Sequence, residues 1–149
     1  MSRAGTPGEP VCYSERVTQA NGRRDPAVRV SLLPRDTNPH GTIFGGVILS
    51  YIDQAGAIEA FHHGAQRVVT VAMDKVVFHA PVYVGDLVSF YGELVRLGRT
   101  SITVKVEVEA ELPTRSAPAR RVTEAVITYV NVDERGAPTP IVHPEPPQG

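Results

Sequence analysis

The alternation of apolar and polar residues in the second half of the chain predicts a set of antiparallel strands. It is clearest at residues 101–111, where Ile102, Val104, Val106 and Val108 alternate with Thr103, Lys105, Glu107 and Glu109. Successive side chains of a strand point to opposite faces, so this pattern is typical of a strand with one buried and one solvated face. Apolar stretches bounded by Pro, Gly and Asp predict four further strands, over residues 27–33, 67–79, 86–97 and 121–132.

One long stretch, residues 46–63, predicts a helix instead, with Gly64 as its C-terminal stop. Its apolar residues cover most of the circumference, which is typical of a buried helix. The predicted order is therefore strand, helix and four strands. Because no helix separates the later strands, we expect an antiparallel sheet of the α+β class, with the single long central helix wrapped by five curved strands.

The ends of the chain differ from its middle. Residues 1–10 predict a flexible N-terminal tail, and residues 136–149, which include five prolines, predict a Pro-rich C-terminal tail. Residues 11–135 are expected to form a single domain, which is long enough to bury a hydrophobic core.

Composition argues against several classes of protein. The 15 Lys and Arg residues nearly balance the 16 Asp and Glu residues, for a net charge of −1, which disfavours a nucleic-acid-binding function. No apolar run reaches the roughly 18 residues that cross a membrane. The single cysteine, Cys12, excludes an internal disulfide and favours a reducing compartment, so we expect a cytoplasmic protein.

No metal site is expected, because neither His-x-x-x-His nor Cys-x-x-Cys spacing occurs. His62 and His63 lie in the last turn of the predicted helix, where positive charge interacts favourably with the helix dipole. His40 is expected to shape its loop and His79 to end a strand.

The segment from Asp36 to Asp53 carries the candidate chemistry. A polar loop leads into Gly45 and Gly46, and Asp53 follows two turns into the helix. Backbone N–H groups at a helix start lack intrahelical partners and can bind a carbonyl oxygen. A carboxylate among apolar residues can act as a base or a nucleophile. These features predict acyl transfer or thioester hydrolysis; the alternative is a structural Asp53 that pairs with a cation or an N–H group.

Asn38, in the loop before the helix, also has two interpretations. Its amide could hold a substrate carbonyl or a water molecule, or it could form an Asx-turn before Pro39.

These residues resemble the hotdog-fold acyl-CoA thioesterases of the small bacterial type with a broad acyl-CoA range. The resemblance covers roughly residues 28–133 and is carried by the ordered segments 36–53, 67–72, 78–86, 97–101 and 123–125. It implies a helix inside the sheet and subunits paired edge to edge, hence at least a homodimer, with tetramers or hexamers left open. It also implies an acyl-CoA substrate and no separate cofactor, because coenzyme A is part of the substrate.

The resemblance assigns roles to individual residues. Asp53 takes the place of the acidic catalytic residue, Asn38 that of the loop amide, and Gly45 and Gly46 those of the oxyanion-hole glycines. The hairpin at 98–101 resembles the segment that touches coenzyme A. The expected substrate-binding residues are Thr70, Arg96, Arg99, Thr100 and Ser101, with Phe44 and Phe78 as walls of an apolar acyl pocket to which Met73 and Val76 could also contribute.

Arginines at strand ends remain ambiguous, since Arg96, Arg99 and Arg121 could meet the coenzyme A phosphates or be solvated. Two other functions also stay open. Enoyl-CoA hydratases on the same fold carry an Asp-x-Asn-Pro-x-His loop, but Asp36-Thr-Asn-Pro-His40 is one residue shorter, which re-aims both side chains. A non-catalytic acyl-CoA sensor would carry a DNA-binding segment, and the residues before the first strand offer no helix-turn-helix.

Overall fold

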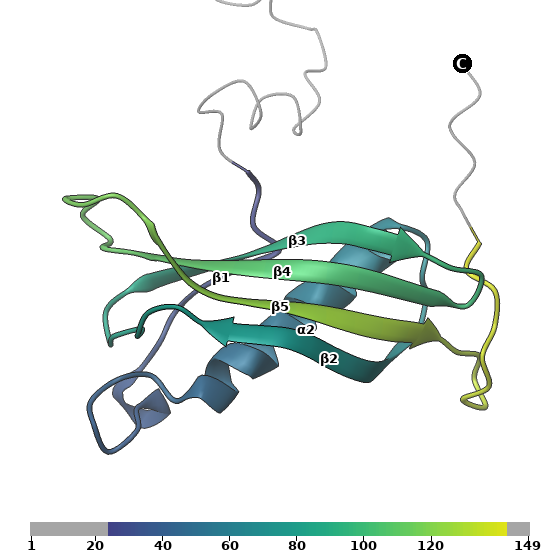
Figure 1. Ribbon diagram of the computed structural model, residues 1–149, viewed down its shortest axis with the longest axis horizontal. Helices are drawn as coiled ribbons and strands as arrows, with labels where there is room; N and C mark the ends of the chain where they lie inside the picture. Colours follow the sequence, from purple (N-terminus) through teal and green to yellow (C-terminus); the bar gives the residue numbers. More distant parts are fainter. Residues whose placement is uncertain (1–23, 143–149) are drawn as a thin grey trace, which may run out of the picture.

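The computed structural model describes residues 24–142 of the chain. A short strand and a 3₁₀ turn, β1 (Val28–Ser31) and η1 (Pro34–Asp36), precede the single helix α2 (Gly45–His62). Four long strands follow in the order β2 (Val68–Phe78), β3 (Leu87–Leu97), β4 (Ser101–Glu111) and β5 (Arg120–Asn131). Figure 1 shows them as one curved sheet crossed by the helix. The expected N-terminal tail, residues 1–10, and Cys12 lie outside the described residues.

All strand pairs are antiparallel, in the spatial order β1-β3-β4-β5-β2. The predicted α+β class, with one helix and a five-stranded antiparallel sheet, is therefore confirmed. The four long strands begin and end within one residue of the predicted bounds. The first strand ends two residues early, because Leu32 turns into the core and η1 starts at Pro34.

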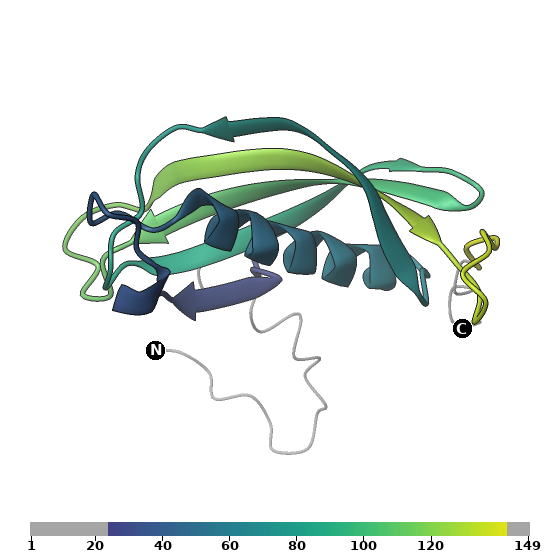
Figure 2. The ribbon, with the colours of Figure 1, turned by 90° about the horizontal axis from the view of Figure 1, so that it is seen from below.

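The core lies between the concave face of the sheet and α2, which lies beneath the curved sheet in Figure 2. The apolar residues of the alternating pattern in β4 are all fully buried. Ala125, Ile127 and Tyr129 of β5 are buried in the same layer. The predicted register of faces in β4 is therefore confirmed.

The helix differs from its prediction in two respects. It runs from Gly45 to His62, so it begins and ends one residue earlier than expected, with Phe44 as its N-cap. It is also not buried all round: Ile48, Ile52, Ala55, Gly56 and Ala60 are buried, but Phe44 and Phe61 are 57% and 46% exposed. One sheet can cover only one side of a helix, so the isolated chain leaves part of the apolar circumference uncovered.

The edge strand β2 is also apolar and exposed. Val69, Val71, Val77 and Phe78 are each more than 40% exposed on this edge of the sheet. An edge strand presents unpaired backbone groups as well, so this combination marks a surface that association would cover.

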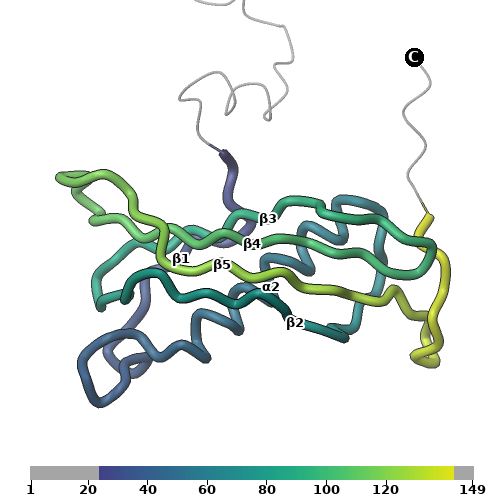
Figure 3. Tube along the Cα trace, viewed as in Figure 1, coloured from purple at the N-terminus to yellow at the C-terminus, as the bar shows by residue number. Residues whose placement is uncertain are grey.

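The described part of the expected C-terminal tail, residues 136–142, is packed rather than free. Ile141 is buried and its N–H donates to the Arg99 carbonyl oxygen at 2.9 Å. Asn131 is bonded to this segment through its side-chain amide and through its carbonyl oxygen, which accepts from the Thr139 N–H. Prolines prevent regular structure here, but they do not prevent an apolar residue from reaching the core. The Cα trace in Figure 3 shows this segment beside the β3–β4 hairpin, at the end of the sheet opposite the loop that precedes α2.

Candidate functional site

The start of α2 is held open by the loop before it. The Phe44 N–H donates to the Asp36 carbonyl oxygen and the Ile43 N–H to the Val82 carbonyl oxygen, both at 2.8 Å. Within the described chain, no side chain caps this helix at Phe44. The first N–H groups of an α-helix have no intrahelical acceptor. The N–H groups of Gly45 and Gly46 therefore have no acceptor within the helix, and the oxyanion-hole role expected of them stays a prediction.

The two glycines are flanked by the two predicted aromatic walls. A Cβ atom at Gly46 would lie 3.0 Å from Cε1 of Phe44, and one at Gly45 would lie 3.3 Å from Cζ of Phe78. Any larger residue at these positions would crowd the rings and cover the N–H groups. Phe44 and Phe78 thus border the helix start, although both are about half exposed in a single chain.

Asn38 uses its amide within its own loop. Its Oδ1 accepts hydrogen bonds from the N–H groups of His40 at 2.9 Å and Thr42 at 3.2 Å, and its Nδ2 donates to Thr42 Oγ1 at 2.7 Å. This is the Asx-turn that the sequence left open. Asn38 therefore shapes the loop that carries the glycines, and one of its two amide hydrogens remains for a ligand.

Asp53 is fixed by two contacts from the sheet. Thr70 of β2 donates a hydrogen bond from Oγ1 to Asp53 Oδ1 at 2.7 Å, and Tyr129 of β5 donates from its hydroxyl to the Asp53 carbonyl oxygen at 2.7 Å. Burial, followed by the nearby Asp53 charge, raises the pKa of Tyr129, so its hydroxyl stays a donor. Among the described residues, no cation contacts the Asp53 side chain, so the structural interpretation of Asp53 as the partner of a cation is not supported. The side chain accepts a hydrogen bond from a neutral hydroxyl instead.

Sequence reasoning missed Tyr129 as a positioning residue. The alternation of β5 could have indicated it, because Tyr129 falls on the core face with Ala125 and Ile127. A buried tyrosine hydroxyl usually needs a hydrogen-bond partner. Tyr129 approaches Gly56 so closely that a Cβ atom there would collide with its hydroxyl, which explains why this position of α2 is a glycine.

The predicted residues fall into two groups, one at the start of α2 and one around its middle. Asn38, Gly45, Gly46, Phe44 and Phe78 lie at its start. Asp53 contacts Thr70 of β2. The strand register then leads across the sheet from Thr70 to Leu97 at the end of β3, through Tyr129 of β5 and Ile102 of β4. The β3–β4 hairpin with Arg99, Thr100 and Ser101 therefore lies at the same end of the sheet as Thr70, and Arg96 precedes it on β3. The side chains of Arg96 and Arg99 are exposed there.

A cavity of about 320 Å³ opens beside the start of α2. Gly45 and Phe78 line it, whereas Asp53 does not. Its other lining residues are Ile43, Ile48, His79, Ala80, Pro81, Val82 and Thr123. The lining is predominantly apolar, as expected of an acyl pocket, but of the four predicted wall residues only Phe78 belongs to it; Phe44, Met73 and Val76 do not.

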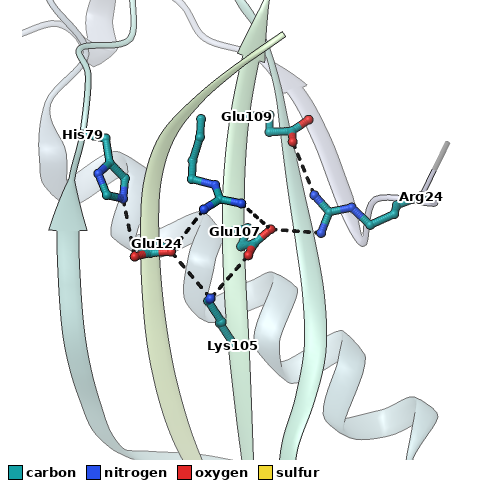
Figure 4. A network of polar contacts seen from close by, with 7 residues as sticks. Arg24, His79, Lys105, Glu107, Glu109 and Glu124 are labelled. Atoms are coloured by element: carbon teal, nitrogen blue, oxygen red, sulfur yellow. Dashed lines mark hydrogen bonds and ion pairs between the residues drawn. The ribbon is translucent and has the colours of Figure 1, made fainter.

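The convex face of the sheet carries a network of charges, shown in Figure 4. His79 contacts Glu124 at 3.4 Å, and Arg121 contacts Glu107 at 3.4 Å and Glu124 at 3.9 Å. Burial raises the pKa of Glu107, but Arg24, Arg121 and Lys105 outweigh it and hold the pKa below its ordinary value. Arg121, a candidate for the coenzyme A phosphates, is thus paired within the sheet, and His79 has a structural partner at its strand end.

Asp36 and His40 do not form the acid–base pair of a hydratase. Asp36 Oδ2 accepts from the Leu33 N–H at 2.9 Å, and His40 is exposed. Neither lines the cavity. Within residues 24–142, no group of three or more His, Cys, Asp or Glu residues is arranged to hold a metal ion. No helix in this part of the chain is long and apolar enough to span a membrane.

A single helix under a five-stranded antiparallel sheet, with an uncapped glycine start and a carboxylate two turns on, is the arrangement of a hotdog-fold thioesterase. The family model described as the thioesterase superfamily matches residues 40–117. The acyl-CoA thioester hydrolase YciA of Escherichia coli is 40% identical over 116 residues, which cover 76% of this chain and 88% of YciA.

Solved structures agree with these matches. A hexameric hotdog fold thioesterase of Campylobacter jejuni superimposes with a TM-score of 0.74 and 47% identity, covering 80% of this chain and 91% of that one. An acyl-CoA hydrolase from Staphylococcus aureus, solved with butyryl coenzyme A, gives a TM-score of 0.71 and 28% identity, covering 82% and 74%. The chain belongs to the thioesterase superfamily and has the hotdog fold.

Proposed function

We propose that this protein hydrolyses the thioester bond of acyl-CoA, releasing a carboxylic acid and free coenzyme A. The observation that carries the proposal is that α2 presents two features that two copies of the helix can bring together. The N–H groups at its glycine start are left without a cap, and Asp53 is held in place by Thr70 and Tyr129.

Each feature supplies one requirement of the reaction. The Gly45 and Gly46 N–H groups, at the positive end of the helix dipole, stabilise the negative charge that develops on the carbonyl oxygen. Asp53 takes a proton from the attacking water, which then displaces the coenzyme A thiolate. Alternatively, Asp53 attacks the carbonyl carbon itself, the C–S bond breaks to release the coenzyme A thiolate, and water then opens the resulting anhydride. The Thr70 hydroxyl orients the carboxylate, and Asn38 keeps the glycine loop in shape.

The two features must come from different chains. Gly45 and Asp53 are eight residues apart, which is about 12 Å along a helix axis. One thioester carbonyl cannot contact both, so the site requires a second helix. The exposed apolar edge of β2 and the uncovered side of α2 provide the surface for a second copy. We therefore propose at least a homodimer, in keeping with the hexameric state named for the Campylobacter jejuni relative.

The substrate's coenzyme A part is assigned to the hairpin end of the sheet. Arg96 and Arg99 are exposed there, as phosphate-binding residues must be, and Thr100 and Ser101 lie beside them. No separate cofactor is proposed, because hydrolysis needs only water and the residues named above. An acyl-CoA substrate and a single cysteine in the chain support a cytoplasmic location.

A thiol-release assay on acyl-CoA esters of increasing chain length tests the proposal. We expect release of one coenzyme A thiol per ester cleaved. A change in enoyl absorbance without thiol release would indicate a hydratase instead, and binding without either reaction would indicate a sensor.

A further inference from the structure

The hydroxyl of Thr123 is unusual among the buried groups of this protein. Within residues 24–142, its Oγ1 is the one buried side-chain polar atom without a hydrogen-bond partner, and the residue is 1% exposed. Burying a hydroxyl without a partner is costly, and native proteins seldom do so. Valine would fill the same space in a strand without that cost. We therefore expect the Thr123 hydroxyl to have a hydrogen-bond partner that is not part of the described chain.

Strand geometry places Thr123 on the core face of β5. It alternates in phase with Ala125, Ile127 and Tyr129, which are all buried in the core layer. Its neighbour Glu124 belongs instead to the charge network on the convex face. Thr123 pairs with Phe78 of β2, so it lies at the end of the sheet that covers the start of α2.

At this end Thr123 lines the cavity of about 320 Å³ that also contains Gly45. The cavity has an exposed rim formed by Phe78, His79 and Pro81. Its buried floor is formed by Ile43, Ile48, Val82 and Thr123. Thr123 is therefore the one polar side chain among the residues of an otherwise apolar floor.

We propose that Thr123 is a specificity-determining residue that hydrogen-bonds an oxygen atom on the acyl chain of the substrate. This inference rests on the proposed thioester hydrolysis, in which the reacting carbonyl is bound at the start of α2. The remaining acyl carbons then enter the cavity, whose buried floor includes Thr123. The favoured substrates are acyl-CoA esters with a hydroxyl or carbonyl oxygen on the acyl chain. A threonine hydroxyl can donate to a carbonyl oxygen, and it can donate to or accept from a hydroxyl group.

The physical basis for discrimination is the state of the Thr123 hydroxyl in the complex. A plain acyl chain would cover it and leave it without a partner, whereas an oxygenated chain would satisfy it. A neutral hydrogen bond of this kind typically changes an equilibrium by about five- to tenfold. The quantity to compare is therefore the ratio of kcat/KM between an oxygenated substrate and its plain counterpart, rather than either rate alone.

The test compares kcat/KM for butanoyl-CoA with that for 3-hydroxybutanoyl-, 3-oxobutanoyl- and 4-hydroxybutanoyl-CoA, by thiol release. We expect Thr123→Val to lower the ratio of an oxygenated substrate to butanoyl-CoA at least about fivefold. Thr123→Ser keeps the hydroxyl and should keep most of that preference. Ile48→Val trims the same floor without changing a polar group, so it should alter both substrates of a pair alike.

Thermal unfolding of the same variants separates this role from a structural one. Removing an unpartnered buried hydroxyl should leave the melting temperature of Thr123→Val unchanged or raise it, and Thr123→Ala provides a second hydroxyl-free variant should Val not fold. An unchanged substrate ratio in both hydroxyl-free variants would overturn the inference while leaving thioester hydrolysis in place. An equal loss on all substrates would also overturn it. No turnover by the parent protein would refute the proposed function itself.

Discussion

Asp53 is the residue on which the proposed hydrolysis depends most directly. We expect Asp53→Asn to fold and to lose at least about 10²-fold in kcat, because the change keeps the shape but removes the base or nucleophile. Thiol release measures the loss, and circular dichroism checks the fold. Asp25→Asn, an exposed carboxylate in the described part of the chain, is the matched control. Near-parental hydrolysis by Asp53→Asn would remove Asp53 from the reaction.

Gly56 is a second position where a single atom matters. A Cβ there would collide with the Tyr129 hydroxyl, which donates to the Asp53 carbonyl oxygen. Overpacking of a core typically costs 1–3 kcal/mol, so we expect Gly56→Ala to lower the free energy of unfolding by about 2 kcal/mol. Because Tyr129 also positions Asp53, kcat should fall in the same variant. Urea unfolding provides the measurement, with Ser50→Ala on the exposed side of α2 as the control.

At the scale of elements, the turn before β3 depends on a buried ion pair with β5. Arg120 Nη2 contacts Asp86 Oδ2 at 2.6 Å, and Asp86 Oδ2 also accepts from the Tyr83 N–H at 2.9 Å. The Asp86 side chain is 5% exposed and that of Arg120 is 37% exposed. Removing one partner of a fully buried pair costs about 3–5 kcal/mol, and solvent at Arg120 reduces this.

We therefore expect Arg120→Ala to lower the free energy of unfolding by about 2 kcal/mol, as measured in urea. Arg120 also donates to the Pro81 carbonyl oxygen at 3.3 Å, so the variant should loosen the cavity wall and raise KM. Arg35→Ala, an exposed arginine in η1, should change neither quantity. Parental stability of Arg120→Ala would mean that Asp86 is satisfied without it.

The charge network ties β4 to β5 and gives stability a pH dependence. The pKa of Glu107 is lowered in the folded state, because Arg24, Arg121 and Lys105 outweigh the effect of burial. A lowered pKa stabilises the folded protein above the unfolded-state pKa, about 4.3, and this contribution is lost as the pH falls through the folded-state value. Glu107→Gln should thus reduce the urea midpoint at pH 7 and change it much less near pH 3. Glu134→Gln, in an exposed turn, should show no such dependence, and equal effects of Glu107→Gln at both pH values would argue against the network.

At the scale of the whole molecule, the separation of the glycines from Asp53 predicts active sites shared between two chains. An Asn38→Ala chain has a disrupted loop and an intact Asp53, and an Asp53→Ala chain has the reverse. Each should be nearly inactive alone, and a mixed dimer should contain one complete site. Co-refolding equal amounts should recover up to about a quarter of parental activity, since half the dimers are mixed and each has one of two sites.

The control replaces the Asp53→Ala chain with an Asn38→Ala, Asp53→Ala double variant, which supplies no intact loop and should give no recovery. Mass spectrometry confirms that mixed dimers form in both experiments. Mixed dimers without activity in the first mixture would place the loop and Asp53 in the same chain's site.

Local patterns were sufficient to predict the elements and part of the site. Period-two alternation determined the bounds and buried face of β4, and the glycine pair followed by Asp53 indicated the start of α2 and its chemistry. Such signals are local, because helix and strand periodicity and the missing side chain of glycine act within a few residues. The same local reasoning placed the helix start one residue late and read residues 136–142 as a free tail.

Contacts between distant residues were decided only by the tertiary structure. The order β1-β3-β4-β5-β2 brings Thr70 to Asp53, 17 residues away, and Tyr129 to the same residue from 76 residues away. It also places Thr123 beside Gly45 in one cavity and keeps the Asp53 carboxylate out of it. The sequence determined which residues carry reactive groups, because residue type fixes that chemistry. Sheet order and the close approach of side chains determined which groups meet, because those depend on packing across the whole fold.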